Sequence, residues 1–159
     1  MIGKKSIIAQ HIRNGNNAYF SGNYGRAISD YSEAIRLDPQ NSAAYNNRGL
    51  SHYELKEFGL AVEDYSEAIR INPNLAATHN NRGVTYGELK EFGREIEDYN
   101  EAIRLDPNNA EAHYNLGYTY HEMKEYARAI EYYDAAIRLD SDYEAARENR
   151  HESYIMLYF

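Results

Sequence analysis

The chain has 159 residues, enough for one ordinary domain or one short repeat array but too few for a catalytic domain joined to a regulatory one. Its net charge of −8 opposes binding to nucleic-acid phosphates and to anionic lipid surfaces, so neither nucleic acid nor a membrane is expected as a partner. It contains no cysteine, which excludes disulfides, thiolate metal sites and cysteine nucleophiles.

The N-terminal segment is not expected to act as an export or membrane signal. Met1 to Lys5 is basic, but the apolar run that follows, Ile7 to Ala9, is too short for the core of a signal peptide or for a membrane span. We therefore expect a cytoplasmic chain.

From about residue 8 onward the sequence repeats with a period of 34 residues. The segment Asp30–Pro39 recurs almost unchanged as Asp64–Pro73 and Asp98–Pro107, and a looser fourth copy runs from Tyr132 to Ser141. Four copies in register predict a repeat architecture. The repeats are expected at about 8–41, 42–75, 76–109 and 110–143.

Each repeat is predicted to form a helical hairpin. In the first, apolar residues from Tyr24 to Ile35 follow helical spacing and mark the second helix of the unit. In the next, Tyr45 to Tyr53 marks a first helix, and a Glu-Leu-Lys-Glu segment forms a tight turn to its partner. Pro39 and its equivalents end the second helices. After residue 143 one more helix, about 144–159, begins without a partner.

These features resemble the tetratricopeptide repeat family over roughly residues 8 to 141. The resemblance implies an all-α fold, a right-handed superhelical solenoid of four helical hairpins closed by a C-terminal capping helix, in a single domain spanning 1–159. It also implies a scaffold for protein–protein interaction, with a protein or peptide as partner.

Several residues depart from the family pattern. Asn14, Arg48 and Arg82 stand where the family has leucine, which is expected to weaken packing. Glu95 stands in a column otherwise filled by alanine, where the two helices of a repeat approach each other closely. Its carboxylate is expected to extend outward to solvent or to loosen the third repeat.

A ligand on the concave wall of such a solenoid would contact residues that recur every 34 positions on the first helices. Asn47, Asn81, Asn115 and Asn149 form such a ladder, whose place in the first repeat is taken by Arg13. An asparagine amide can pair with both the N–H and the C=O of a peptide backbone. The column resembles the asparagine ladder in the repeats of O-linked N-acetylglucosamine transferases. Alternatively, it bridges neighbouring helices.

Other side chains on the same helices would form the floor and rim of this groove. The floor residues are Asn46, Asn80, Tyr114, Leu50, Val84 and Tyr118. Glu54, Glu88 and Glu122 form a rim that favours a basic ligand, or that is simply solvated.

Some members of the family use a clamp to bind the acidic C-terminus of heat-shock chaperones. Asn16 and Asn47 occupy two positions of that clamp, and we include Asn16 among the peptide-binding candidates. The three basic positions are filled by Ile12, Ala77 and Asn81, which disfavours binding of such a tail.

The sequence carries no phosphate-binding glycine loop, nucleophile elbow or His-Glu-x-x-His motif. We therefore expect no catalytic residues, no metal and no cofactor, and not an enzyme. The alternative function is structural: the apolar end from Tyr154 to Phe159 would drive assembly into a homo-oligomer through the terminal helices.

Overall fold

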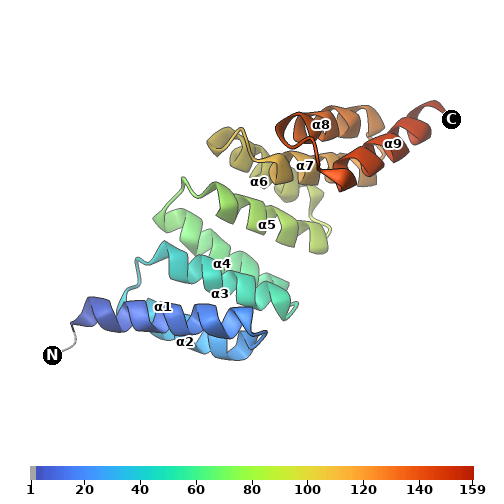
Figure 1. Ribbon diagram of the computed structural model, residues 1–159. Coiled ribbons are helices and arrows are strands. Elements are labelled where there is room, and N and C mark those ends of the chain that lie inside the picture. Colours follow the sequence, from blue (N-terminus) through green and yellow to red (C-terminus); the bar gives the residue numbers. More distant parts are fainter. Residues whose placement is uncertain (1–2) are drawn as a thin grey trace.

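The computed structural model describes residues 3–159, in which all regular structure is helical, as predicted (Figure 1). The helices are α1 (Lys4–Phe20), α2 (Tyr24–Leu37), α3 (Ser42–Glu54), α4 (Phe58–Ile71), α5 (Ala76–Glu88), α6 (Phe92–Leu105), α7 (Ala110–Glu122), α8 (Tyr126–Leu139) and α9 (Glu144–Tyr158). The first eight pair as hairpins, and α9 packs on α8 at the C-terminal end.

The ends of the helices follow from local chemistry. Asn23, Asn41 and Asn109 cap α2, α3 and α7 by accepting a hydrogen bond from a backbone N–H in the first turn. In three of the repeats the second helix ends two residues before a proline, because proline disfavours helix in the residue that precedes it, which here is the C-cap residue.

The turn inside each hairpin contains one residue in the left-handed region. In the first repeat this residue is glycine, Gly22, with φ of 72°. In the other three it is a lysine, Lys56, Lys90 and Lys124, with φ between 59° and 63°. A backbone hydrogen bond closes each of these turns, such as that from Lys56 N to Tyr53 O at 2.8 Å.

Glycine–tyrosine contacts hold the two helices of a hairpin together. An added Cβ at Gly49 would lie 2.7 Å from the Tyr65 ring, and one at Gly83 would lie 2.8 Å from the Tyr99 ring. The tyrosines are almost fully buried, together with small alanines such as Ala61. The column of glycines therefore makes room for the column of tyrosines.

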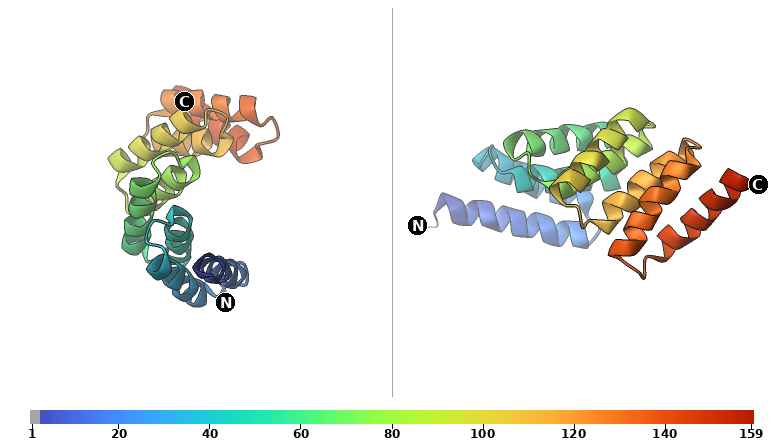
Figure 2. Two further views of the ribbon diagram at one scale, coloured as in Figure 1. Left: turned by 90° about the vertical axis from the view of Figure 1, so that its left-hand side faces the viewer. Right: turned by 90° about the horizontal axis from the view of Figure 1, so that it is seen from above.

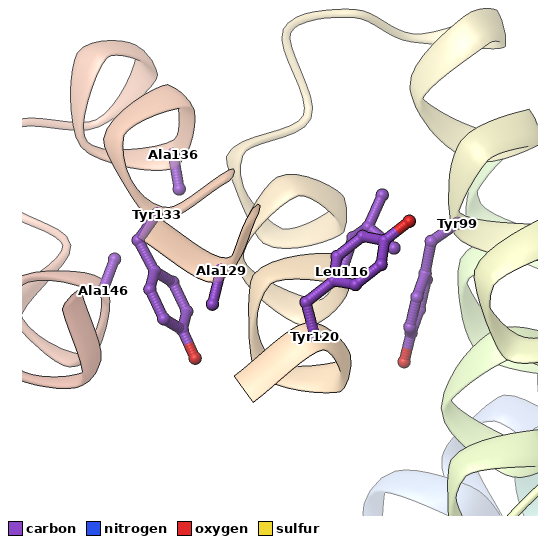
Figure 3. Packing of buried hydrophobic residues seen from close by; sticks show 7 residues of the cluster. All are labelled: Tyr99, Leu116, Tyr120, Ala129, Tyr133, Ala136 and Ala146. Atoms are coloured by element: carbon purple, nitrogen blue, oxygen red, sulfur yellow. The ribbon is translucent and has the colours of Figure 1, made fainter. Parts of the chain in front are cut away.

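The largest buried cluster lies toward the C-terminal end of the array. It joins Tyr99 of α6 to residues of α7, α8 and α9 (Figure 3). In Figure 3, Tyr133 of α8 lies near Ala146 of α9, so the last helix covers the apolar side of the fourth hairpin.

The arginines in the leucine column form ion pairs in place of the apolar contacts of a leucine. Arg48 forms a two-pronged ion pair with Asp64 at 2.6 and 2.8 Å and donates to Ser32 Oγ at 3.0 Å. Arg82 does the same with Asp98, at 2.7 and 2.8 Å. Each arginine thus links the two helices of its own hairpin, and its hydrogen bond to the serine links that hairpin to the preceding one.

The hairpins follow one another in an arc (Figure 2). Each odd-numbered helix has Cα atoms within 8 Å of the next odd-numbered one, whereas within residues 3–159 consecutive even-numbered helices have none that close. The odd-numbered helices are therefore closer together and line the concave side. This arrangement places the asparagine ladder on the inner wall.

Candidate functional site

The ladder asparagines link neighbouring odd-numbered helices. The side-chain amides of Asn47, Asn81 and Asn115 donate to Asn16, Asn46 and Asn80, respectively, each at 3.3 Å. Asn149 of α9 donates to the Tyr114 hydroxyl at 3.0 Å. Within the chain, the asparagines of this column therefore bridge neighbouring helices.

Bridging uses only part of the hydrogen-bonding capacity of each amide. An asparagine amide has two N–H donors and an acceptor oxygen, and the bridge occupies one donor. The Oδ1 atoms of Asn81 and Asn115 accept no hydrogen bond from the described residues. Asn47 differs, because its Oδ1 accepts from Asn46 at 3.1 Å. Two rungs thus keep a free acceptor beside a free N–H.

The first repeat contributes Asn16 rather than Arg13 to this row. Asn16 accepts hydrogen bonds from the Tyr31 hydroxyl at 2.7 Å and from Asn47. Arg13 has the phase of the ladder but is exposed, and its guanidinium donates to Gln10 on its own helix at 2.9 Å.

The floor residues next to the ladder have two different surroundings. Asn46 is half-buried and also accepts from Thr78 at 2.9 Å, and Asn80 is only 5 % exposed. Their side chains serve the contacts between helices. Tyr118, by contrast, is 47 % exposed and is open to a ligand.

Three hollows follow one another along the concave wall, one at each junction between α1, α3, α5 and α7. Each is lined by a ladder asparagine, by Leu50 or Val84, and by a tyrosine contributed by the even-numbered helix behind. These tyrosines are Tyr31, Tyr65 and Tyr99. The hollows therefore repeat with the period of the sequence.

The predicted glutamate rim borders these hollows. Glu54 lines the second hollow, and Glu88 and Glu122 line the third. All three are exposed, and Glu54 accepts a hydrogen bond from the Tyr19 hydroxyl at 3.3 Å. Burial, together with this carboxylate, raises the pKa of Tyr19.

Glu95 behaves differently from its prediction. It neither extends to solvent nor separates the helices of its repeat: the residue is 5 % exposed, and α5 packs on α6 as in the other hairpins. Its Oε1 accepts a hydrogen bond from Thr119 of α7 at 2.7 Å. The reason is Gly87 on α5, which stands where other repeats have Tyr19, Tyr53 or His121 and leaves space for the carboxylate.

The tyrosines behind the hollows were missed as site residues. They belong to the apolar stripe of the second helices, and periodicity assigns them to the core alone. The sequence feature that could have identified them is the glycine that faces each tyrosine and recurs with the same period, such as Gly83 for Tyr99. Because this glycine has no side chain, the tyrosine ring can reach the inner wall.

Within the described residues no group of three or more His, Cys, Asp or Glu side chains is arranged to hold a metal ion. No helix in the described part of the chain is long and apolar enough to cross a membrane.

Comparison with known proteins identifies the repeats. Family models described as tetratricopeptide repeat match residues 12–76, 76–109 and 111–143, and a TPR repeat model matches residues 96–124. Hsp70-Hsp90 organizing protein 3 of Arabidopsis thaliana is 46 % identical over 41 residues. That match covers 26 % of this chain and 7 % of the plant protein, a small part of its length.

Solved structures with the same fold include MamA and the first TPR of Spaghetti (RPAP3). One MamA crystal structure has a TM-score of 0.84 at 23 % identity, covering 89 % of this chain and 82 % of MamA. A MamA RS-1 ArsTM double mutant has a TM-score of 0.89 at 16 % identity, covering 99 % and 88 %. The RPAP3 repeat, bound to the HSP90 peptide SRMEEVD, has a TM-score of 0.73 at 25 % identity, covering 77 % and 96 %.

The matched segments together run from residue 12 to residue 143, and the hairpins of the structure repeat along the same stretch. The chain therefore belongs to the tetratricopeptide repeat family.

Proposed function

We propose that the chain is a protein-interaction scaffold whose concave surface binds an extended peptide segment of a partner protein. Asn47, Asn81 and Asn115 contact the peptide backbone, and the neighbouring side chains select among sequences. The observation that carries this proposal is the series of hollows, each bordered by a ladder asparagine with unused hydrogen-bonding capacity.

The spacing of the ladder suits an extended chain. Packed helices lie about 8–10 Å apart, and an extended peptide advances about 3.3 Å per residue. Successive rungs then meet the backbone at about every third residue. Because backbone groups are the same in every peptide, this contact tolerates many sequences.

Two of the similar proteins support a peptide as the class of partner. The RPAP3 repeat is bound to an HSP90 peptide, and the plant relative is named as an Hsp70-Hsp90 organizing protein. An acidic tail is nevertheless a poor ligand for this chain, because Ile12, Ala77 and Asn81 replace the basic clamp positions and glutamates border the hollows. We propose a neutral or basic segment instead.

The test is binding of fluorescently labelled, unrelated extended peptides, followed by anisotropy. A variant carrying Asn47→Ala, Asn81→Ala and Asn115→Ala is expected to bind at least about tenfold more weakly across different sequences. A net hydrogen bond contributes about 1 kcal/mol, and a tenfold change corresponds to about 1.4 kcal/mol.

The control replaces three exposed asparagines away from the ladder, Asn74, Asn100 and Asn108, by alanine. Circular dichroism verifies that both variants are helical at the temperature of the assay. A folded ladder variant that binds as tightly as the native chain contradicts the proposal.

A second candidate function is self-association through the terminal helices. The apolar end of α9 does not pack back on the array: Ile155 is 44 % exposed, Met156 54 % and Tyr158 63 %. An exposed patch of this kind is a candidate interface between copies.

We further propose that residues 1–159 act as one domain with repeats at about 8–41, 42–75, 76–109 and 110–143. Each hairpin can bury its apolar face only against its neighbours. No catalytic role is part of this proposal, and the location we propose is the cytoplasm.

A further inference from the structure

The hollow between α5 and α7 differs from the two before it. Its volume is about 250 Å³, against about 160 Å³ for each of the others. Two substitutions within the repeat pattern produce the difference. Gly87 replaces the tyrosine that lines the earlier hollows as Tyr19 and Tyr53, and Glu95 replaces an alanine. An aromatic wall is thus exchanged for space and a carboxylate.

The carboxylate of Glu95 has too few hydrogen bonds for its burial. Oε1 accepts from the Thr119 hydroxyl, but that hydroxyl also lies 3.0 Å from the Asn115 carbonyl oxygen and has only one hydrogen to donate. Oε2 is buried and has no partner among the described residues. A buried polar atom normally has one, because leaving it unpaired is costly.

The competing acceptor is the usual one in this column. Ser51, Thr85 and Ser153 occupy the place of Thr119, and each donates to the backbone carbonyl four residues earlier, at 2.8 to 3.0 Å. Thr119 therefore has a standard helical partner in addition to Glu95. Burial raises the pKa of Glu95, an effect that the Thr119 hydroxyl and the charge of Lys90 oppose only in part.

The surroundings of this hollow favour a cation. Glu88 and Glu122 border it, and Lys90 is the basic residue in its lining. Aromatic rings of Phe92, Tyr99 and Tyr118 also line it. Carboxylates provide charge and acceptors, and aromatic faces attract guanidinium and ammonium groups.

We propose that this hollow, which we name the Glu95 pocket, binds the basic side chain of a peptide lying in the groove, arginine in preference to lysine. The inference rests on the proposed function, since the peptide backbone contacted by Asn115 presents the side chain to the pocket. Arginine fits better because its planar group has five N–H donors, enough for Oε2 of Glu95 and for a rim carboxylate, and it stacks on aromatic rings.

The test compares two labelled alanine-rich peptides that differ at one central residue, arginine in one and its neutral isostere citrulline in the other. The native chain is expected to bind the arginine peptide at least about tenfold more tightly, because hydrogen bonds between charged groups are stronger than those of the neutral citrulline. Glu95→Gln is expected to reduce that preference to less than about threefold. Glu97→Gln, an equal charge change at an exposed position of α6, is expected to preserve it.

A second variant rebuilds the hollow of the preceding repeat. Gly87→Tyr combined with Glu95→Ala recreates the pair formed by Tyr53 and Ala61, so it is expected to fold and to lose the preference for arginine. Equal binding of both peptides by the native chain overturns the pocket. So does an undiminished arginine preference in Glu95→Gln.

A smaller probe separates this inference from the groove itself. N-acetylargininamide carries the side chain without a long backbone, and its binding can be followed by NMR through the amide signals of Gly87 and Thr119. Shifts in the native chain that disappear in Glu95→Gln support the pocket even if the asparagine ladder proves purely structural. If both peptides bind the native chain equally and only the ladder variant loses binding, the groove stands and the Glu95 pocket is wrong.

Discussion

At the scale of single residues, burial affects two acids in opposite ways. Asp98 and Glu95 are both almost fully buried on α6. Burial acts against the charged form of each, but hydrogen bonds from Arg82 and His79 outweigh it at Asp98 and lower its pKa. Among the described residues Glu95 has no arginine or histidine donor, the Thr119 hydroxyl and the charge of Lys90 oppose its burial only in part, and its pKa is raised. The hydrogen-bond partners of a buried acid therefore decide whether its pKa is raised or lowered.

Glycine also has two roles at this scale. Gly49 lies against the Tyr65 ring, whereas within the described part of the chain nothing comes within 4 Å of a Cβ built at Gly59. We expect Gly49→Ala to lower the free energy of unfolding by about 1–3 kcal/mol through overpacking. Gly59→Ala is expected to raise it by up to about 1 kcal/mol, because alanine is the better helix former. Urea unfolding followed by circular dichroism measures both, and an equal effect of the two substitutions would show that the tyrosine contact is unimportant.

At the scale of elements, the turn inside the hairpins stores strain in three repeats out of four. Lysine occupies a left-handed conformation that glycine adopts without a steric penalty, and Gly22 occupies the same position in the first repeat. The sequence predicted a tight turn at Glu-Leu-Lys-Glu. It did not indicate which of the four residues would take the positive φ.

This turn allows a reciprocal exchange. Lys56→Gly is expected to raise the free energy of unfolding by up to about 1 kcal/mol, and Gly22→Lys is expected to lower it by a similar amount. The left-handed conformation costs an L-residue about 1–2 kcal/mol. The greater freedom of glycine in the unfolded chain offsets part of this cost. The midpoint of thermal unfolding reports both. Changes of the same sign in the two variants would refute strain as the explanation.

At the scale of the whole molecule, the array is an arc whose inner wall consists of odd-numbered helices (Figure 2). Its C-terminal end carries an exposed apolar patch on α9. Ile155, Met156 and Tyr158 line none of the three hollows, so substitutions there can alter self-association without removing a residue of the hollows.

The second candidate function predicts a molar mass that rises with concentration. Light scattering coupled to size-exclusion chromatography measures it, and Ile155→Ser with Tyr158→Ser is expected to restore the monomer. Leu60→Ser, which removes an exposed apolar side chain on α4, is the control and is expected to leave association unchanged. A native chain that is monomeric at every concentration rules out this function.

The sequence by itself determined the repeat architecture, because it is encoded by spacings of three, four and 34 residues that require no knowledge of distant contacts. The ladder of Asn47, Asn81 and Asn115 could be found in the same way. Only the tertiary structure decided that these amides bridge neighbouring helices while some of their hydrogen-bonding groups stay unpaired. It also decided that Arg82 pairs with Asp98.

The tertiary structure also decided that the side chain of Glu95 is buried. A carboxylate in an alanine column predicts exposure when only its own helix is considered. Its burial depends on the space left by Gly87 on one helix and on the hydroxyl of Thr119 on another. The hydrogen bonds and the solvent exposure of Glu95 depend on side chains from three helices. These side chains are brought together by the packing of the hairpins, so no local sequence pattern predicts them.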